Sequence, residues 1–391
     1  MKINNYTFII VIACSTISAQ SLGDLSFGTD ESFEVMTWNI EWFPKNGQTT
    51  VDSVSTIIQS LDIDLYSFQE ISDTNLFKQM IDDIDGYDYY FQSDWFGGLA
   101  YVYKTSVIEI NTIYEIYIEE PYWRPFPRSP MVMEMTYQDQ NYYIINNHFK
   151  CCGDGVMNLS DPWDEETRRF DASNFLKEYI DLYLPNENVI VLGDLNDILT
   201  DVTANNVFQV IIDDDSNFLF ADSEIANGPS SGWSYPNWPS HIDHILITNE
   251  LLDDFENNSS IIQTIAIDDF MEGGYNAYDE NISDHLPVAL KLVDDLDLDD
   301  GPAVSQNYHL ANYPNPFNPM TTISYNISKK GHVDISVYNL SGQLIDHLVD
   351  NEMSPGSYTV TLYTENLSSG LYFYTLATDN KTVTKKMLLL K

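Results

Sequence analysis

The stretch Val189-Ile190-Val191-Leu192-Gly193-Asp194-Leu195-Asn196 joins an apolar run to two polar side chains. Short apolar runs rich in β-branched residues are typical of buried strands. Residues two positions apart in an extended chain face the same way, so Asp194 and Asn196 can converge on one point. The stretch therefore predicts a polar centre at the end of a buried strand.

A related arrangement recurs along the chain, with a carboxylate, an amide or an imidazole at one end of an apolar run. The segments are Trp38-Asn39-Ile40, Phe68-Gln69-Glu70, Asn146-Asn147-His148, His241-Ile242-Asp243-His244 and Ser283-Asp284-His285. The spacing rule also predicts that His241 and Asp243 converge. One such residue alone is more often a solvated loop residue or a locally hydrogen-bonded histidine. Several together predict a cluster gathered at strand ends.

Between residues 33 and 292, strand-like and helix-like stretches alternate. Apolar residues recur at helical spacing over 51–61, and a long helix is predicted over 165–184. Strands are predicted over 33–38, 64–70, 99–103, 131–137, 142–148, 189–192, 242–248 and 288–292. This mixture predicts a two-sheet α/β sandwich whose strand ends carry the catalytic residues.

A second domain is predicted to follow. Residues 294–308 form an acidic linker; a calcium loop is the alternative, but Gly301 falls one place late for the EF-hand spacing. Short β patterns at 322–326, 333–338, 357–363 and 371–377 then predict a small all-β, immunoglobulin-like sandwich. We therefore expect a signal peptide at 1–19, a catalytic domain at 31–293, the linker, and a C-terminal domain at 309–391.

The first residues have the pattern of a secretory signal peptide. An apolar stretch over 6–17 precedes Ser18-Ala19 and is too short to span a membrane. Cys14, at the end of this stretch, leaves a lipoprotein signal open as the alternative. Cleavage near Ala19 would leave the adjacent pair Cys151 and Cys152, which excludes a disulfide framework. No later stretch of the sequence reaches the length of a transmembrane segment.

The chain is strongly acidic, with a formal net charge of -43 from 60 acidic and 17 basic residues. This balance argues against a surface that coats nucleic acid by positive charge. From His309 onward, six lysines balance six acidic residues, so the excess negative charge lies before His309. Such a surface attracts divalent cations and repels polyanions unless a metal or nearby arginines and lysines compensate.

In this order, the polar segments resemble the motifs of the endonuclease/exonuclease/phosphatase superfamily, to which deoxyribonuclease I belongs. The resemblance covers about 33–292 and implies a deoxyribonuclease I-like sandwich. It implies that Glu70 is the principal metal-binding carboxylate, that Asn39 supports the metal or the phosphate, and that Asp284 adds a ligand. Oxygen ligands of this kind suit Mg²⁺ or Mn²⁺.

The same resemblance implies roles in proton and phosphate chemistry. His285 matches the catalytic imidazole, and Asp243 matches the carboxylate that accepts its ring N–H. Asp194 and Asn196 match a Gly-Asp-x-Asn motif that positions the attacking water and the phosphate. His148 matches a second imidazole that contacts the phosphate or the leaving oxygen.

Other matches concern the substrate. Arg128 resembles a phosphate-contacting arginine of deoxyribonuclease I. In that enzyme a glutamate supports the second histidine, whereas this chain offers Gly97 or Gly98, so His148 is expected to be supported differently. Trp123 and Trp163 lie near arginines in the sequence and are the candidates for stacking on bases.

The Cys151-Cys152 pair follows His148 in a loop beside the predicted centre. Two adjacent cysteines make a poor tetrahedral zinc set. A vicinal disulfide and two free thiols are both left open.

The C-terminal region resembles the type A sorting domain of the type IX secretion system. The segments that carry this resemblance are 313–319, 337–342, 370–374 and 385–391. It implies export to the outer cell surface or the medium, with the type IX machinery as a partner. An immunoglobulin-like accessory module without a sorting role is the alternative.

The expected function is that of a secreted, Mg²⁺-dependent phosphodiesterase, an extracellular endonuclease with DNA or RNA as substrate. A phosphoesterase acting on phospholipid headgroups or other small phosphate esters is the first alternative, and a non-catalytic surface binding module is the second. The sequence indicates no obligate protein partner.

Overall fold

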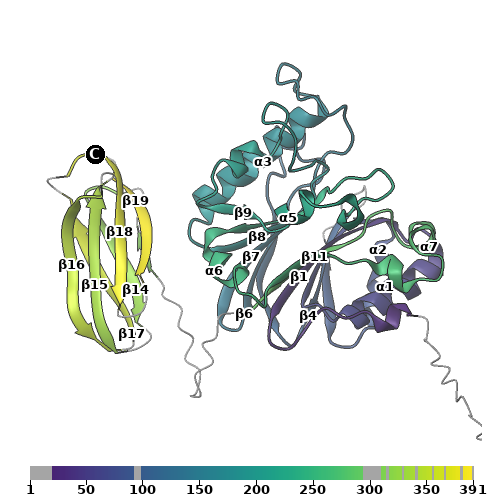
Figure 1. The fold of residues 1–391 in the computed structure, drawn as a ribbon, viewed down its shortest axis with the longest axis horizontal. Helices are drawn as coiled ribbons and strands as arrows, with labels where there is room; N and C mark the ends of the chain where they lie inside the picture. Colours follow the sequence, from purple (N-terminus) through teal and green to yellow (C-terminus); the bar gives the residue numbers. More distant parts are fainter. Residues whose placement is uncertain are drawn as a thin grey trace, which may run out of the picture. The chain divides into compact units, whose positions relative to one another are not determined.

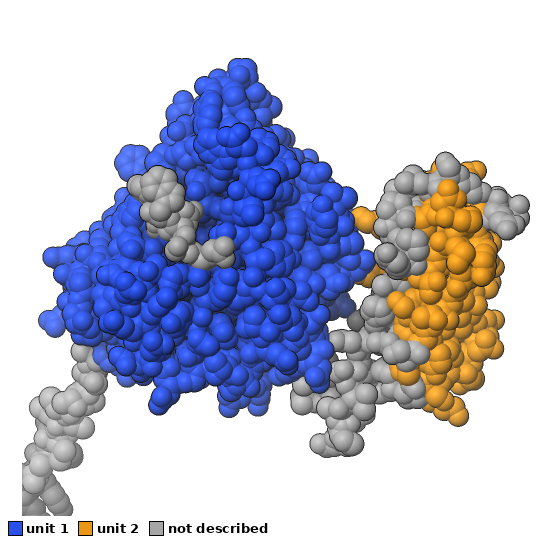
Figure 2. Space-filling view, turned by 180° about the vertical axis from the view of Figure 1, so that it is seen from behind, with its two compact units in different colours: residues 1–294 blue, residues 295–391 orange. Residues whose placement is uncertain are grey.

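The protein is represented by a computed structural model that describes residues 20–91, 98–293, 310–313, 317–327, 330–339, 342–354, 356–364, 367–378 and 382–389. The chain divides into two compact units, residues 1–294 and 295–391 (Figure 2). The predicted signal peptide, the predicted linker, Trp95 and Gly97 lie outside the described residues. No helix in the described part of the chain is long and apolar enough to cross a membrane.

The described residues of unit 1 form two six-stranded sheets (Figure 1). In order across the first sheet, the strands are β11 (Ile261–Thr264), β12 (Val288–Leu292), β1 (Phe33–Phe43), β2 (Leu65–Ile71), β4 (Gly98–Lys104) and β3 (Tyr87–Phe91). Across the second they are β5 (Ile108–Glu115), β6 (Met131–Tyr137), β7 (Gln140–His148), β8 (Asn188–Asp194), β10 (Asp243–Thr248) and β9 (Phe218–Phe220). The pairs β1–β2 and β7–β8 are parallel. The carboxyl ends of each parallel pair therefore meet at one edge of their sheet.

The helices lie on the outer faces of the sheets. Helices α1 (Gly47–Leu61), α2 (Thr74–Asp82) and α7 (Tyr275–Asn281) pack on the first sheet, and α3 (Glu165–Tyr183) and α4 (Gln209–Ile212) on the second. The remaining helical segments are η1 (Leu22–Asp24), α5 (Ser223–Ala226), η2 (Ser230–Gly232), η3 (Asn249–Leu251), α6 (Leu252–Phe255) and η4 (Ile267–Phe270). This arrangement confirms the predicted α/β sandwich.

Strand alternation separates the core between the sheets from the two outer cores. On β1, Val35 faces the other sheet while Met36 and Trp38 pack under the helices. On β8, Ile190 and Leu192 face inward in the same way. Because side chains alternate along a strand, the next positions of this parity carry polar side chains between the sheets at the strand ends.

Unit 2 is all β. Strands β13 (Leu310–Tyr313), β14 (Met320–Ile327) and β17 (Gly356–Tyr363) form one sheet. Strands β16 (Leu344–Met353), β15 (Gly331–Asn339), β18 (Gly370–Thr378) and β19 (Thr382–Leu389) form the other. Buried residues of both sheets share one apolar cluster, among them Ile323, Val337 and Tyr374. These two packed sheets are the small β-sandwich that the sequence predicted.

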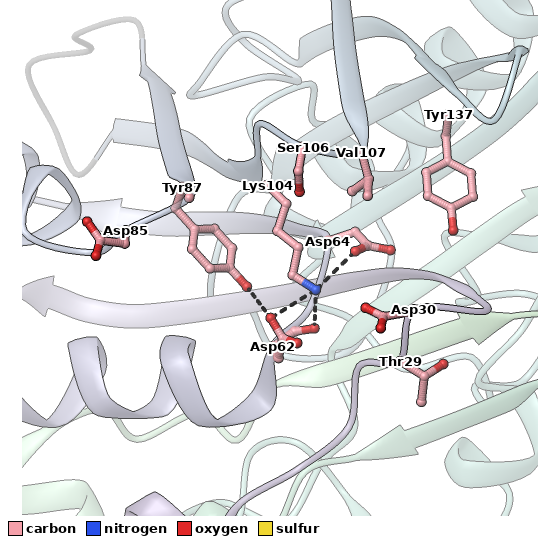
Figure 3. Close-up of a pocket in the computed structure, with 11 residues that line it drawn as sticks. Thr29, Asp30, Asp62, Asp64, Asp85, Tyr87, Lys104, Ser106, Val107 and Tyr137 are labelled. Carbon is pink, nitrogen blue, oxygen red and sulfur yellow. Dashed lines mark hydrogen bonds and ion pairs between the residues drawn. The ribbon is translucent and has the colours of Figure 1, made fainter.

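A pocket of about 320 Å³ lies where β1 and β2 begin (Figure 3). Lys104 Nζ is 2.9 Å from Asp62 Oδ1 and 3.2 Å from Asp64 Oδ1 in this pocket. Six residues of β-strand separate Asp64 from Glu70, which is about 20 Å at the usual rise. The pocket is therefore at the opposite end of the sheet from the predicted catalytic residues.

Candidate active site

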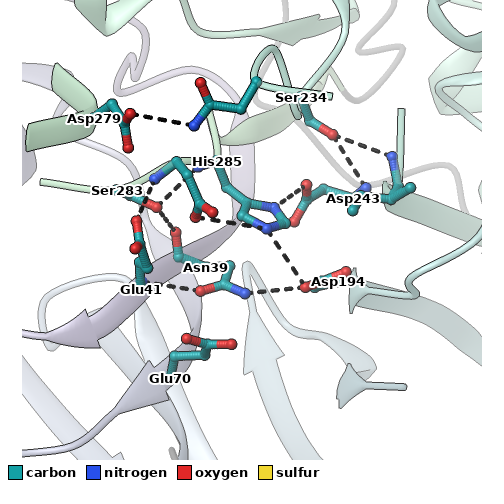
Figure 4. A network of polar contacts seen from close by, with 12 residues as sticks. Asn39, Glu41, Glu70, Asp194, Ser234, Asp243, Asp279, Ser283 and His285 are labelled. Carbon is teal, nitrogen blue, oxygen red and sulfur yellow. Dashed lines mark hydrogen bonds and ion pairs between the residues drawn. The ribbon is translucent and has the colours of Figure 1, made fainter. Parts of the chain in front are cut away.

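Strand parity brings polar side chains from both sheets to one place. Asn39 on β1, His148 on β7, Asp194 on β8 and Asp243 on β10 are all buried and occupy the inward-facing positions. Glu70 has the opposite parity on β2, but its backbone is left-handed, with φ of 67°, and the β1–β2 register shifts beside it. A left-handed residue turns the side chain out of the strand alternation. Asn39, Glu70, Asp194 and Asp243 converge although they are far apart in the sequence (Figure 4), and His148 Nε2 lies within 3.9 Å of the carboxylates of Glu70 and Asp194.

His285 and Asp243 form the centre of this cluster. His285 Nδ1 lies 2.8 Å from Asp243 Oδ2, and its Nε2 lies 3.8 Å from Asp194 Oδ2 and 3.9 Å from Asp284 Oδ1. Burial alone would lower the pKa of His285, but the charges of Asp243 and Asp194 raise it to about 10. The imidazole is therefore protonated at neutral pH and carries a positive charge between carboxylates.

Both oxygens of the Asp194 carboxylate accept a hydrogen bond. One carboxylate oxygen accepts from Asn39 Nδ2 at 3.0 Å, and the other accepts from the backbone N–H of Asn196 at 3.0 Å. Burial raises the pKa of Asp194 to about 7, against the lowering effect of the His285 charge. A carboxyl with a pKa near neutrality can both accept and release a proton at physiological pH.

Gly193 explains why the strand can end in this way. Its φ is 151°, and a Cβ placed on it would lie 2.0 Å from the backbone oxygen of Asn147 on the neighbouring strand. Asn196 follows with φ of 55° and donates its side-chain N–H to the backbone oxygen of Phe149 at 3.3 Å. The close approach of β7 and β8 thus depends on a glycine before Asp194.

Glu70, Asp284 and Asn39 are the residues that the family resemblance assigns to a metal, and hydrogen bonds hold their surroundings. Glu70 Oε2 accepts from the Trp42 backbone N–H at 3.2 Å, and Asn39 Oδ1 accepts from the Glu41 N–H at 3.0 Å. Glu41 in turn accepts from the Asp284 backbone N–H at 2.8 Å and pairs with Lys45. Burial raises the pKa of Glu41, Lys45 lowers it, and the charge of Asp284 raises it again. The oxygens of the buried Asn39 amide and of the half-buried Glu70 and Asp284 carboxylates are of the kind that suits a hard divalent cation.

His148 is the second imidazole of the cluster. Its Nε2 lies 3.5 Å from Asp194 Oδ2 and 3.9 Å from Glu70 Oε1. Its Nδ1 is buried and has no hydrogen-bond partner among the described residues, which leave out 92–97. Burial, together with the positive charges of Arg128 and His285, lowers the pKa of His148 well below its ordinary value. His148 is therefore neutral, and Arg128 is close enough to act on it electrostatically.

Sequence reasoning missed several residues that hold the cluster. The Ser283 hydroxyl donates to the Asn39 backbone oxygen at 2.7 Å, and the Ser234 hydroxyl accepts from the Asp243 N–H at 3.2 Å. The Tyr235 ring packs on His285 with 4.8 Å between centroids. These contacts, like those of Glu41, join segments that no local pattern connects. Ser283, which directly precedes the Asp284-His285 pair, was the available signal.

His241 does not join Asp243 at His285, contrary to the spacing rule. It precedes β10, and its Nε2 lies 3.0 Å from Asp222 Oδ2. His244 Nδ1 lies 2.6 Å from the same oxygen, and His244 Nε2 lies 2.9 Å from the Asp197 backbone oxygen. Asp222, which sequence reasoning also missed, thus bonds both histidines of a second buried cluster.

The tautomers show that this second cluster is a hydrogen-bonded support. The Ser234 backbone N–H donates to His241 Nδ1 at 3.2 Å, so the ring proton is on Nε2, which cannot then ligate a metal. His244 faces an acceptor on each nitrogen and is doubly protonated. Burial alone would raise the pKa of Asp222, but the charge of His244 lowers it. Burial alone would lower the pKa of His244, but the charge of Asp222 raises it.

The predicted stacking residues lie together on the surface. The rings of Trp123 and Trp163 are 6.1 Å apart between centroids, and each side chain is about half exposed. Arg124, beside Trp123, forms an ion pair with Asp171 at 2.5 Å. Trp123 and Trp163 therefore offer aromatic surface to solvent, while Arg124 is already neutralised by an acidic partner.

Comparisons with known proteins identify the family of the first unit and the class of the second. A model of the endonuclease/exonuclease/phosphatase family matches residues 36–285, and a model of the secretion system C-terminal sorting domain matches residues 311–390. No curated protein matches the chain. The sorting domain indicates a secreted or outer-surface protein.

Solved structures share the fold of unit 1. TDP2 of D. rerio in complex with a single-strand DNA product is 13% identical, with a TM-score of 0.51 over 67% of this chain and 99% of that one. A humanized D. rerio TDP2 gives 13% identity and a TM-score of 0.50 with the same coverage. The human nocturnin catalytic domain with a bound sulfate is 14% identical, with a TM-score of 0.48 over 67% of this chain and 94% of that one.

Proposed function

The chain belongs to the endonuclease/exonuclease/phosphatase family, and on that premise we propose that it is a secreted, Mg²⁺-dependent phosphodiesterase that cleaves DNA or RNA internally. The observation that carries the proposal is the His285 imidazolium held by Asp243 at 2.8 Å, facing Asp194 within the same cluster as Glu70 and His148. Such a pairing of a fixed positive charge with a carboxylate of neutral pKa suits hydrolysis at a phosphate.

Glu70, Asp284 and Asn39 would hold the cation. The chemistry that a bound Mg²⁺ or Mn²⁺ supplies there is charge neutralisation at the phosphate oxygens. The hydrogen bonds from Trp42 to Glu70 and from Glu41 to Asn39 orient the two side chains before substrate arrives. Orientation in advance lowers the reorganisation needed in the transition state.

His285 and Asp243 act on the phosphate as a unit. Asp243 fixes the ring through Nδ1, so the Nε2–H can donate to a phosphoryl oxygen as negative charge builds on it. Asp243 Oδ1 is buried without a hydrogen-bond partner among the described residues, so the His285 ring is the group to which this carboxylate is bonded. The pair stabilises the transition state by electrostatics and forms no covalent intermediate.

Asp194 is the group that would take a proton from the attacking water. Hydrogen bonds from Asn39 and from the backbone of Asn196 orient its carboxylate. Burial raises its pKa to about 7, so it can accept a proton at neutral pH. His148 and Arg128 complete the phosphate site, His148 through a neutral ring and Arg128 through its charge. The removal of any one of these residues is expected to reduce kcat more than it changes KM.

The runner-up substrate is a phospholipid headgroup or another small phosphate ester. The net charge of -43 favours a substrate with fewer negative charges than a duplex. A purely binding role is disfavoured because the sequence keeps the eight residues assigned to the centre, namely Asn39, Glu70, His148, Asp194, Asn196, Asp243, Asp284 and His285.

A substrate panel tests the proposal. Supercoiled plasmid, single-stranded oligonucleotide, RNA and phosphatidylcholine vesicles are each incubated with the purified protein and Mg²⁺, with and without EDTA. We expect nicked plasmid or shortened oligonucleotides in Mg²⁺ and none in EDTA. Release of phosphocholine without nucleic-acid cleavage would favour the runner-up, and turnover of none of the substrates would refute a catalytic role.

A further inference from the structure

The loop that follows His148 carries two thiols that the proposed mechanism does not use. Cys151 and Cys152 are both exposed and both free. Their Sγ atoms lie 2.9 Å apart, within about 1 Å of the length of a disulfide bond. Closing a bond between them therefore needs little side-chain movement.

The backbone on both sides of the pair is held from outside the loop. Arg169 on α3 is 3% exposed, and its Nη1 donates to the backbone oxygens of Lys150 at 2.8 Å and Cys152 at 2.7 Å. The backbone of Cys152 has the left-handed conformation, with φ of 72°. At Gly153 a Cβ would lie 2.1 Å from Glu166 Oε1, so the chain turns tightly against α3. The two thiols are thus kept side by side by their surroundings.

A disulfide between adjacent residues would be strained. Consecutive Cα atoms are about 3.8 Å apart, below the range of about 4.4–6.8 Å found in ordinary disulfides. Strained and exposed disulfides are more easily reduced than structural ones. A bond at this position is therefore suited to reversible formation.

The two thiols are not equivalent. Lys150 Nζ lies 3.6 Å from Cys151 Sγ, so Cys151 is the thiol of the pair that lies directly beside a positive charge. The hydrogen bond with Cys151 and partial burial raise the pKa of Cys152. Cys151 is therefore the thiol that reacts first.

We propose that Cys151 and Cys152 form a thiol–disulfide exchange site that closes reversibly to a vicinal disulfide in reaction with a disulfide of a small molecule or a protein. The Cys151 thiolate attacks one sulfur of the donor, whose S–S bond breaks and whose other sulfur leaves as a thiolate. The Cys152 thiol then loses its proton, attacks the Cys151 sulfur and releases the second donor sulfur. The pair is oxidised by two electrons, the donor is reduced by two, and the two cysteine protons end on the two product thiols.

Arg169 connects this site to the proposed active site. Its Nε donates to Asp197 Oδ2 at 2.8 Å, and Asp197 directly follows Asn196 in the Gly-Asp-x-Asn segment. Closing the disulfide ring would change the backbone dihedral angles of Cys151 and Cys152. The Cys152 carbonyl, which accepts a hydrogen bond from Arg169, would then change its direction. We expect the dithiol form to cleave plasmid about threefold faster or more. This last step rests on the proposed nuclease function; the exchange chemistry does not.

The test uses the purified full chain treated with oxidised glutathione, followed by intact-mass measurement and peptide mapping. Wild type should lose two hydrogen atoms and yield a peptide in which Cys151 and Cys152 are joined, and glutathione in excess should restore the dithiol. The matched controls are Cys151→Ser and Cys152→Ser, in each of which the one thiol left in the loop can only retain glutathione as a mixed disulfide; peptide mapping distinguishes this thiol from Cys14.

A stable mixed disulfide on wild type, a covalent dimer, or no reaction at all would overturn the exchange site. Nicking rates are then measured on the oxidised and reduced forms. Equal rates, after ring closure has been seen by mass, would overturn the coupling to catalysis. Absence of nicking in both forms would count against the nuclease proposal while leaving the mass result unaffected.

Discussion

At the scale of single residues, the charges that surround each histidine determine its protonation state. His285 lies among three carboxylates and is protonated, whereas His148 lies near Arg128 and His285 and is neutral. The two histidines are both buried, so burial alone cannot separate their behaviour. The difference comes from the charges that each ring meets, and those charges sit on strands far apart in the sequence.

Asp243→Asn is expected to reduce kcat by about 10²- to 10⁴-fold and to move the alkaline limb of the pH–rate profile toward lower pH. His285 must be protonated to act, and its pKa of about 10 depends on the Asp243 charge. Removal of that charge lowers the pKa, so activity is lost at a lower pH. The measurement is the pH–rate profile together with an NMR titration of the His285 ring.

The matched control is Asp52→Asn, which removes an exposed carboxylate on α1 that bonds only locally to Gln48 among the contacts described. It should leave both the rate and the pH profile unchanged. An alkaline limb in Asp243→Asn identical to that of wild type would contradict the role of the pair.

The residue roles were only partly accessible from sequence. Asp194, Asp243 and His285 could be predicted to gather because each lies at one end of an apolar run: Asp194 closes β8, Asp243 opens β10 and His285 precedes β12. Glu41 could not, because its carboxylate meets the backbone of a residue 243 positions away. His241 was misplaced because the period-two rule applies inside a strand, and β10 begins only at Asp243.

At the scale of elements, the parallel pairs β1–β2 and β7–β8 bring the functional strand ends together. The strands of these pairs were predicted because they are long, apolar and buried. β3, β5, β9 and β11 were not predicted: they lie at or next to sheet edges, and several are short or largely polar. Such strands form because a neighbour offers them hydrogen bonds, which a local pattern does not reveal.

Gly193→Ala is expected to destabilise unit 1 by about 2–4 kcal/mol, because the new methyl group would collide with the Asn147 backbone oxygen on β7. The measurement is the midpoint of thermal unfolding followed by circular dichroism. Gly232→Ala is the control, since a Cβ there meets nothing within 4 Å. Equal midpoints for the two variants would show that β7 and β8 do not need this close approach.

Glu34, at the start of β1, makes the stability of the sheet depend on pH. Burial raises its pKa to about 8, with Ser32 opposing and the charge of Asp64 reinforcing the shift. A carboxyl whose pKa is raised on folding stabilises the protein at low pH, and this contribution is lost as the pH rises from its ordinary value toward 8. The protein should therefore lose stability across this range.

Glu34→Gln is expected to raise the free energy of unfolding at pH 8 by about 2 kcal/mol. It should also flatten the decline of the free energy of unfolding between about pH 5, the ordinary upper end of carboxyl titration, and pH 8. Urea unfolding at several pH values provides the measurement. Glu109→Gln, on an exposed position of β5, serves as the comparison. A decline of the same steepness in Glu34→Gln and wild type would exclude Glu34 as its cause.

At the scale of the whole molecule, the two units have separate cores and separate tasks. The apolar clusters of the sandwich contain only residues of unit 1, and the cluster of the β-domain contains only residues of unit 2. The family match lies within the first and the sorting match within the second. The turn-punctuated β pattern of the tail predicted its class, although β13, β16 and β19 were missed.

A chain that ends at residue 294 is expected to keep the nicking rate and thermal midpoint of unit 1 and to lose export. The separate cores are the physical reason, since no core residue of the first unit is removed. Cell fractionation of the native host measures the export, and the plasmid assay measures the rate. Secretion of the shortened chain at the level of the full chain would argue against sorting by unit 2.

The proposed function requires one buried cluster to hydrolyse phosphodiester bonds with a divalent cation and the His285 imidazolium. Its most direct test is the single-turnover rate of plasmid nicking in Mg²⁺ for wild type and His285→Ala, each repeated in EDTA. We predict nicking by wild type that EDTA abolishes, and a rate for His285→Ala lower by about 10³-fold or more. Equal rates for the two proteins, or nicking by wild type that persists in EDTA, would contradict the account.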